Sequence, residues 1–591
     1  MDPVLLEVVR NRLSTIADEM EISLIRAAYS PIVKEGSDAS SALFNRHGEM
    51  IAQAVSIPAH LGCLGPALEA IVASHPVERM RPGDVYVLND PYQGGSHLPD
   101  IILVMPVFVG PELVGFTTTM CHHQEVGGMV PGSLPPNATD VFQEGLRLPP
   151  LKLVDAGQPV EPLFAVLRSN VRVPHVVLGD LRAQIAACDV GRRRLADLVA
   201  AHGLPAFDRV CAELIRRSEL LTRERLAAIP DGTYRFVDFL DDDGVCPGQP
   251  IRIAVTLTIS GSDVHVDFTG TSPQVRGPFN CVLGTVTSAV YYVIRAVTGP
   301  DIPNNSGCYR PVRVTAPSGS FVNPDPPAPV NSRTATVKRI VDTLMGCFVQ
   351  ALPERLPAAS SGQLLVMNFG GVDPATGQMF VTCELGAGGM GARPGRDGVD
   401  SIDTDATNAM NIPAEAVESD APIRVERWRL WPDSAGAGQW RGGLGVYKVF
   451  RVTRGSVTAT YRGERHTTQP WGIRAGRPAK SSEAWVERAA GATETLASKQ
   501  IVYLQAGDRL HVRMSGGAGY GDPFDRLPDQ VAADVADGYV SREAARTEYG
   551  VVLTESGSLD AAATADLRRR PPIPAPPPLF DRGHLPAGAQ P

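Results

Sequence analysis

Closely spaced cysteines are missing from this sequence, because its nine cysteines stand at least 23 residues apart. This spacing excludes a CxxC zinc or redox pair and favours reduced thiols, for which the cytoplasm is the simplest compartment. Long apolar runs are also missing. The longest, Ile101–Val109, falls far short of the ~20 residues that a membrane-spanning helix needs. The N-terminal stretch MDPVLLEVVRNRL carries charges every few residues, unlike a signal peptide. We therefore expect a cytoplasmic protein with no membrane partner.

Lysine is scarce as well: six of the 55 basic residues are Lys, and the arginines are scattered. With 64 acidic residues the formal net charge is −9, and no long basic run stands out. This charge balance argues against nucleic acid as the main partner. The sequence contains no Gly-Lys-Ser/Thr tripeptide, so it predicts no P-loop for ATP.

Glycine and proline, in contrast, are abundant, with 58 and 51 residues in a chain of 591. The length predicts several domains, and the excess of turn-forming residues predicts substantial β-structure. We expect a multidomain α+β fold with mixed or antiparallel sheets, a long N-terminal helix and a C-terminal mainly β domain. The predicted domains are 1–225 (α+β, carrying the candidate metal site described below), 226–420 (α+β, with a Gly-rich loop), 421–525 (β-rich) and 526–591 (short helices and a disordered Pro-rich tail).

Apolar periodicity predicts the main elements. Apolar residues recur every three or four positions from Val4 to Ala28 and predict one long amphipathic helix, which Pro31 ends. Short strands broken by turn signals follow to about residue 122, and helical patterns return between about 174 and 229. Residues 230–270 alternate like strands, whereas 287–297 and 336–349 are typical of helices. Strand patterns dominate 425–525, and short helices are expected at 527–550.

The stretch NDPYQGGSHLPD places His97 and Asp100 in an HxxD arrangement on a loop rich in Gly and Pro. A strand leaves at residue 101, turns near Gly110-Pro111 and returns at 112–121. In a hairpin with this turn, the numbers of paired residues add up to about 221, so His122 returns opposite Pro99. Two imidazoles and a carboxylate would then converge, a ligand set that suits Zn, Mn or Fe. Two alternatives stay open: simple hydrogen bonding at a hairpin end, and a one-residue slip that presents His123 instead.

Four further features favour a structural interpretation. The stretch GAGGMG (386–391) matches GxGxxG, but ARPGRDG after it cannot begin a helix. We therefore expect a tight glycine loop that other backbone approaches closely, not a dinucleotide site. Asp38 begins a strand, where a lone Asp is most often a turn or cap residue, and His60 is more often a satisfied structural histidine. Cys121 is expected to be a buried strand-end residue and not a nucleophile.

Taken together, a series of motifs resembles the hydantoinase B/oxoprolinase family. They extend in order from about residue 2 to about residue 555, nearly the whole chain. The motifs are SPIVKEGSDASSALFN, IPAHLG, VLNDPYQGGSHLPDI, HHQEVGG, EGLRLPPLKL, NVRVP, GGMGARPGRDG, ATNAMNIPAEAVE, QWRGGLGV and GGAGYGDP.

The resemblance implies one divalent ion, Zn or Mn, held by an Asp, an HxxD pair and a later His. Carried over by motif, the implied metal ligands are Asp38, His97, Asp100 and His122. The interval between the HxxD pair and the later His fits the family pattern and favours His122 over its neighbour.

Two residues of the HHQEVGG motif are candidate catalytic residues. His123 or Glu125 would move protons or orient a ligand. The family commonly has Asp where this chain has Glu125, and the longer side chain leaves the role of this residue open.

The resemblance further implies a function and a partner. The chain would be the metal-bearing subunit of an ATP-dependent hydrolase that acts on carbon–nitrogen bonds of a cyclic amide or imide, such as a hydantoin, 5-oxoproline or a lactam. ATP and Mg would bind to a separate hydantoinase A-type subunit, in a hetero-oligomer such as α2β2. That partner would phosphorylate the amide oxygen, and the metal of this chain would supply hydroxide.

Two other functions stay open at this point. The first is a subunit of an ATP-dependent ketone carboxylase of the acetone or acetophenone type, which would use the same four ligands. The greater length of acetone carboxylase subunits disfavours that branch but not the acetophenone type. The second is a non-catalytic scaffold with a structural metal.

Overall fold

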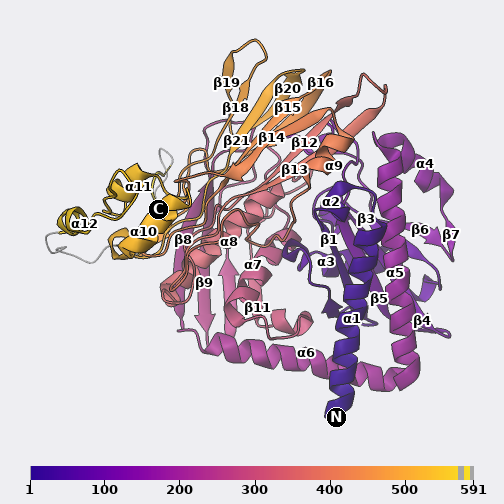
Figure 1. Ribbon diagram of the computed structural model, residues 1–591. Coiled ribbons are helices and arrows are strands. Elements are labelled where there is room, and N and C mark those ends of the chain that lie inside the picture. Colours follow the sequence, from indigo (N-terminus) through magenta and orange to yellow (C-terminus); the bar gives the residue numbers. More distant parts are fainter. Residues whose placement is uncertain (1, 570–577, 586–591) are drawn as a thin grey trace.

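The computed structural model describes residues 2–569 and 578–585, and it confirms the predicted multidomain α+β fold. Figure 1 shows the long N-terminal helix beside a second long helix on the right of the view, with most C-terminal strands gathered at the top. No helix in these ranges is long and apolar enough to cross a membrane. The predicted boundaries at residues 225, 420 and 525 stay predictions.

Helix α1 (Pro3–Ala27) matches the predicted N-terminal helix. The Asp2 carboxylate accepts a hydrogen bond from the Val4 N–H at 2.9 Å, and Pro3 occupies the first helical position, where its missing N–H costs nothing. The buried stripe of α1 packs against α5 (Pro174–His202) and against β1 (Ala39–Asn45). The helix therefore forms as a cover for the first sheet.

That first sheet has seven strands in the order β2-β1-β5-β4-β3-β6-β7. Apolar residues of α1 and α5 cover one face, and α3 (Leu64–Ser74) covers the other. The remaining strands are β2 (Met50–Gln53), β3 (Val85–Leu88), β4 (Asp100–Val109), β5 (Glu112–His122), β6 (Leu151–Asp155) and β7 (Gln158–Pro159). Helices α4 (Glu161–Asn170) and α6 (Leu204–Ala227) complete this part. Helices α5 and α6 agree with the helical patterns predicted for 174–229, whereas α4 lies before that range.

The β4–β5 hairpin corrects the predicted register by one residue. Paired numbers add up to 221 next to the turn, as at Phe108 and Leu113, but to 222 beyond an irregularity between Val107 and Phe108. His122 therefore pairs with Asp100 and not with Pro99. The β-bulge adds one residue to a single strand, which spacing alone does not reveal.

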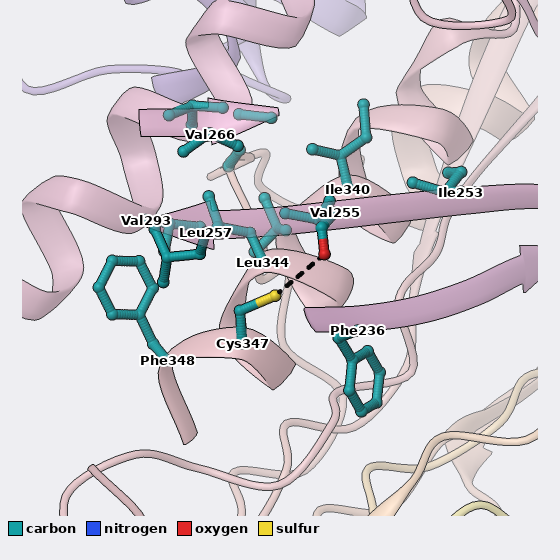
Figure 2. Packing of buried hydrophobic residues seen from close by; sticks show 14 of the residues in the cluster. Phe236, Ile253, Val255, Leu257, Val266, Val293, Ile340, Leu344, Cys347 and Phe348 are labelled. Carbon is teal, nitrogen blue, oxygen red and sulfur yellow. Dashed lines mark hydrogen bonds between the residues drawn. The ribbon is translucent and has the colours of Figure 1, made fainter. Parts of the chain in front are cut away.

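The second layered unit is a four-stranded sheet, β11-β10-β9-β8, packed against two helices. Its elements are β8 (Gly232–Leu240), β9 (Ile251–Ser260), β10 (Asp263–Asp267), β11 (Val312–Thr315), α7 (Leu283–Thr298) and α8 (Arg333–Ala351). Figure 2 shows Val255 and Leu257 of β9 facing Leu344 and Cys347 of α8. This packing fixes α8, whose first residue reaches the candidate site.

Two further sheets, β13-β12-β16-β20 and β14-β15-β21-β18-β19, share one apolar core. Their strands are β12 (Leu364–Val372), β13 (Met379–Ala387), β16 (Ser456–Arg462), β20 (Lys499–Gln505), β14 (Ile423–Leu430), β15 (Val446–Val452), β21 (Arg509–Arg513), β18 (Glu483–Glu487) and β19 (Thr493–Thr495). A short helix, α9 (Ala414–Asp420), lies against β14. The predicted β-structure over 425–525 is confirmed.

The GxGxxG stretch is the expected tight glycine loop. No helix follows it, and a Cβ atom on Gly389 would lie 1.9 Å from the carbonyl oxygen of Gly443. A Cβ atom on Gly391 would lie 1.9 Å from the carbonyl oxygen of Ala358. Glycine is required here because neighbouring backbone segments leave no room for a side chain.

The C-terminal part contains the predicted short helices, α10 (Pro528–Ala536) and α11 (Arg542–Thr547), followed by α12 (Ala561–Leu567). The expectation of a disordered tail is wrong for residues 578–585. There β22 (Phe580–Asp581) pairs with β17 (Gly472–Ile473), and the Phe580 ring lies 5.3 Å from that of Trp471. The Phe580 side chain anchors this stretch. The rest of the predicted tail, 570–577 and 586–591, lies outside the described residues.

Candidate metal centre

Three potential metal ligands converge at the open end of the β4–β5 hairpin. His97 lies in the loop before β4, Asp100 is the first residue of β4, and His122 is the last residue of β5. Their ligand atoms lie within 4.8 Å of one another. Asp100 Oδ1 stands 3.1 Å from His97 Nε2 and 3.4 Å from His122 Nδ1. The convergence predicted from the HxxD loop and the returning strand is thus present.

The polar atoms of this group fit a metal ion. His97 Nε2 and Asp100 Oδ1 are buried and have no hydrogen-bond partner among the described residues. Burial lowers the pKa of His97 to about 3, which keeps its imidazole neutral. Burial alone would raise the pKa of Asp100, but the paired Arg333 guanidinium helps to hold that pKa well below its usual value. A neutral imidazole and an ionised carboxylate are the forms that bind divalent ions.

Backbone contacts orient His97. Its Nδ1 lies 2.9 Å from the carbonyl oxygen of Asn331, so Nδ1–H donates there and Nε2 keeps a free lone pair. The Glu144 carboxylate in turn accepts the N–H groups of Val330 at 2.8 Å and Asn331 at 2.9 Å. A buried carboxyl thus fixes the loop that fixes the imidazole.

Asn89 of the NDP motif holds the same loop from the other side. Its Nδ2 donates to the carbonyl oxygen of Leu98 at 2.7 Å, next to His97 in the chain. Its Oδ1 accepts the N–H of Leu148 at 2.7 Å. The two motifs VLNDPYQGGSHLPDI and EGLRLPPLKL are therefore in contact and together position the HxxD loop.

Arg333, at the start of α8, is a site residue that sequence reasoning missed. Its guanidinium pairs with Asp100 Oδ2 and donates to Ser96 Oγ, and the side chain is buried. The ion pair orients the Asp100 carboxylate and leaves its Oδ1 available to bind an ion. Nothing near Arg333 in the sequence signals the contact, because Asp100 lies 233 positions away.

A cavity adjoins the ligand group, and His97 and His122 form part of its wall. Asp38 lies on the same wall. Its carbonyl oxygen accepts the N–H of His122 at 3.1 Å, because β1 runs beside β5. Its carboxylate is not part of the group that lies within 4.8 Å. Burial raises the pKa of Asp38 to about 6. Its role as a fourth ligand stays a proposal.

The cavity brings two other residues to the ligand group. His60 lies on its wall, with Nδ1 at 2.8 Å from Ser40 Oγ, and burial lowers the pKa of His60 to about 4. His60 is thus hydrogen-bonded, as expected, but it also faces the site. Arg462, at the end of β16, borders the cavity as well. Nothing in the sequence marks Arg462 as a residue of this cavity.

The predicted catalytic residues point elsewhere. His123 Nε2 lies 2.9 Å from Gln184 Oε1 of α5, and burial lowers the pKa of His123. Glu125 pairs with Arg172 at 2.7 Å and accepts two backbone N–H groups of its own loop. Neither side chain lines the cavity, so their predicted catalytic roles gain no support and stay predictions.

The preferred interpretation of Cys121 is confirmed. The side chain is buried, and burial raises the pKa of its thiol well above the usual value. A thiol that resists ionisation is a poor nucleophile.

Comparison with known proteins identifies the family. The sequence model of the family described as hydantoinase B/oxoprolinase matches residues 2–523. The chain belongs to the hydantoinase B/oxoprolinase family. The B-type subunit of a putative D-/L-hydantoinase from Pseudomonas sp. strain NS671 is 34% identical over 586 residues, covering 96% of this chain and 98% of the relative.

Two solved structures are similar to this member of the hydantoinase B family. The crystal structure of the ATP-dependent caprolactamase from Pseudomonas jessenii is 32% identical, with a TM-score of 0.87, and the match covers 96% of this chain and 99% of the other. The nucleotide-free structure of an acetone carboxylase matches with a TM-score of 0.89 at 22% identity, over 96% of this chain and 82% of the other. At that identity the second match shows the fold alone.

Proposed function

We propose that this chain is the metal-binding subunit of an ATP-dependent hydrolase that opens a cyclic amide or imide. The observation that carries the proposal is the buried group of His97, Asp100 and His122, in which His97 Nε2 and Asp100 Oδ1 lack hydrogen-bond partners among the described residues. The names of its relatives, a putative hydantoinase and an ATP-dependent caprolactamase, favour a cyclic amide substrate such as a hydantoin, 5-oxoproline or a lactam. Two of these relatives are named as one subunit of an enzyme, which supports a partner chain.

We assign the metal ligands to Asp38, His97, Asp100 and His122. The mixed nitrogen and oxygen set is compatible with either Zn or Mn. A divalent ion bound here supplies Lewis acidity, which can lower the pKa of a water molecule from 15.7 to about 7. Arg333 and Asn331 hold Asp100 and His97 in place, respectively, so the donor atoms are oriented before anything binds.

The chemistry divides between two chains. Resonance makes an amide carbon a poor electrophile. A hydantoinase A-type partner would transfer the γ-phosphoryl group of ATP to the amide oxygen, which makes that carbon more electrophilic. In the cavity of this chain, water would then add to the activated carbon, and the carbon–nitrogen bond would break as the ring nitrogen takes a proton. The resulting acyl phosphate would be hydrolysed by a second water, which gives the open amino acid and phosphate.

His60 is our candidate for proton transfer in this cavity. It lines the same cavity as the ligand group, and burial lowers its pKa to about 4, which keeps the imidazole neutral but makes it a weak base. We therefore expect it to pass a proton on to a more basic atom and not to retain one. The Ser40 hydroxyl fixes the ring orientation. His123 and Glu125 lack this access to the cavity.

A ketone carboxylase is the second candidate function, because such an enzyme would use the same four ligands and the fold does not distinguish the two activities. The deciding experiment purifies this chain with its hydantoinase A-type partner. It then measures ATP-dependent turnover of hydantoin, 5-oxoproline and caprolactam, and of acetone or acetophenone with bicarbonate. Ring opening of a cyclic amide supports the proposal, whereas carboxylation of a ketone without ring opening contradicts it. Product formation should be lost in His97→Ala, with ATP binding by the partner unchanged.

A further inference from the structure

Arg462 is a buried cation on the wall of the metal cavity. It is 9% exposed, and among the described residues it forms no ion pair. Its Nη2 donates to the carbonyl oxygen of Val366 at 2.9 Å, its Nη1 approaches Ser332 Oγ at 3.4 Å, and Nε has no partner in the described chain. Guanidinium groups are rarely buried without a carboxylate, so this arrangement calls for an anionic ligand.

The neighbouring charges do not neutralise Arg462. Arg333 is already paired with Asp100. Glu144 forms no ion pair with Arg462 among the described residues: its Oε1 accepts the N–H groups of Val330 and Asn331, and burial raises the pKa of Glu144 well above its usual value. Burial lowers the pKa of Arg462 to about 9, and the side chain still carries its charge under physiological conditions.

The start of α8 adds a second positive feature to the same wall. Arg333 and Thr334, in its first turn, line the cavity, and Ser332 just before them touches Arg462. The N-terminus of a helix carries partial positive charge and favours bound anions. A helix N-terminus and an unpaired guanidinium thus face one cavity beside the ligand group.

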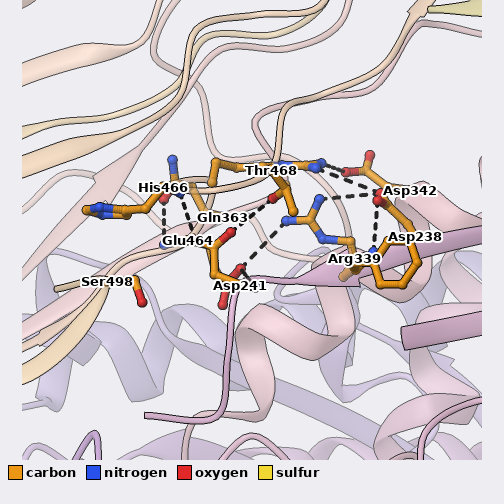
Figure 3. Close-up of polar contacts among 12 residues, drawn as sticks. Asp238, Asp241, Arg339, Asp342, Gln363, Glu464, His466, Thr468 and Ser498 are labelled. Atoms are coloured by element: carbon orange, nitrogen blue, oxygen red, sulfur yellow. Dashed lines mark hydrogen bonds and ion pairs between the residues drawn. The ribbon is translucent and has the colours of Figure 1, made fainter. Parts of the chain in front are cut away.

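A buried ionic network holds these two elements in fixed relation (Figure 3). Asp342 of α8 pairs with Arg465 at 2.7 Å, and the carboxylate of Asp241 accepts the N–H of His466 at 2.7 Å. Glu464 pairs with Lys499 at 2.7 Å. The segment that follows Arg462 is therefore clamped to α8 and β8, which preorganises the guanidinium toward the cavity.

We propose that Arg462 and the N-terminal turn of α8 form an oxyanion subsite for the substrate, beside the candidate metal ligands. The subsite deepens the proposed function, on which its biological role rests. It would bind the phosphoryl group that the partner places on the amide oxygen. A carboxylate of the substrate or product is the other source of the same chemistry, and the planar guanidinium binds either group through paired N–H donors.

The test uses the full-length chain and needs no partner. Isothermal titration calorimetry would measure the dissociation constants of inorganic phosphate and of acetate for wild type, Arg462→Met and Arg462→Lys. Arg454→Met is the matched control, because Arg454 precedes the same strand but lies exposed and paired with Asp373. Metal content of each sample would be measured in parallel. We expect phosphate affinity to fall at least tenfold in Arg462→Met, partly in Arg462→Lys, and not in the control, with metal content unchanged.

Each outcome decides the proposal. Loss of phosphate affinity supports a phosphoryl subsite, and loss of acetate affinity instead supports a carboxylate subsite. If Arg462→Met binds phosphate as tightly as wild type does, and also binds acetate as tightly as wild type does, the proposal is overturned. If Arg462→Met does not fold, hydrogen exchange of wild type decides: phosphate should protect residues 333–336 and 462–464, and no protection counts against the subsite. A chain that turns over no cyclic amide but binds phosphate through Arg462 would refute the proposed function alone.

Discussion

Among single residues, the two adjacent histidines of the HHQE stretch offer an internal control. His122 faces Asp100 and the cavity, whereas His123 turns to Gln184 of α5, because successive residues of an extended chain point to opposite sides. We expect His97→Ala and His122→Ala to lose the bound ion. His123→Ala should retain most of it, since loss of an orienting partner typically costs 10–100-fold in affinity and loss of a ligand costs more.

Elemental analysis of the purified variants, beside their turnover with the partner chain, would check this expectation. Full metal occupancy in His122→Ala would contradict the ligand assignment. Equal losses in His122→Ala and His123→Ala would contradict the distinction between the two rings.

Glu21 of α1 predicts a pH dependence of stability. Burial raises its pKa to about 7, with Asp18 and Asp38 adding to the effect and the Ser41 hydroxyl opposing it. Because the folded state binds this proton more tightly than the unfolded state, its stabilisation is complete below about pH 4.5 and is lost as the pH rises through 7. Glu21→Gln mimics the protonated form. Its advantage over wild type should grow from near zero at pH 4.5 to up to about 3 kcal/mol above pH 7.

Melting temperatures of both proteins from pH 5 to 8 would measure the effect. Glu7→Gln is the control, because Glu7 lies exposed on the same helix and pairs only with Arg10 among the described residues. A constant difference between Glu21→Gln and wild type across this range would refute the buried-carboxyl explanation.

Residues that the sequence did not reveal are those whose partners lie far away in the chain. His97 and Asp100 share one loop, and His122 returns on the next strand, so spacing and a hairpin were enough to predict their convergence. Arg333 and Arg462 reach the same place from α8 and β16. Arginines are scattered throughout this chain, and only the tertiary packing distinguishes these two.

For the secondary-structure elements, periodicity predicted the long helices well because their apolar stripes are regular over many turns. The β4–β5 register was less predictable. A bulge between Val107 and Phe108 leaves no distinctive residue in the sequence, yet it decides that Asp100, not Pro99, shares a face with His122. The predicted convergence of His97, Asp100 and His122 was right, and the predicted pairing was wrong by one residue.

The C-terminal strand β22 yields a prediction that replaces the expectation of a disordered tail for residues 578–585. The Phe580 ring lies 4.9 Å from Phe236 and 5.3 Å from Trp471. Arg582 stands 3.5 Å from Asp238. Phe580→Ala should lower stability by roughly 1–2 kcal/mol, less than the 3–5 kcal/mol of a fully buried Phe, because this ring is half-buried.

Thermal unfolding monitored by circular dichroism would measure this loss, with His584→Ala as the exposed control. Removal of residues 570–591 should destabilise at least as much as Phe580→Ala. An unchanged melting temperature in Phe580→Ala would contradict the anchoring role of this ring.

At the scale of the molecule, segments spread from residue 32 to residue 462 build the cavity, which explains why the complete site could not be read from local motifs. Its wall runs from Ile32 through His97 and Asn331 to Arg462. Buried ion pairs connect α8 and β20 to the segment that follows β16. Such pairs are costly to desolvate, so we expect them to fix the position of this segment more than they stabilise the fold. Composition and the order of motifs predicted the family and the α+β class, but not these contacts between segments far apart in the sequence.

We expect the molecule as a whole to depend on a second chain, which would carry the ATP chemistry while this chain carries the ring opening. The sequence contains no P-loop, and the proposed reaction needs ATP only to activate the amide oxygen. We therefore expect the purified chain to hydrolyse no ATP above the buffer blank. Addition of the hydantoinase A-type partner should give ATP hydrolysis that depends on a cyclic amide.

A coupled assay of ADP release and ring opening would test both halves of this expectation. With His97→Ala, the partner should still bind ATP, but ring-opened product should disappear, because the variant removes a group from the hydrolytic cavity and none from the nucleotide site. ATPase activity in a preparation proven free of the partner would contradict the proposed division. So would normal ring opening by the pair that contains His97→Ala, since the chemistry would then occur away from the ligand group.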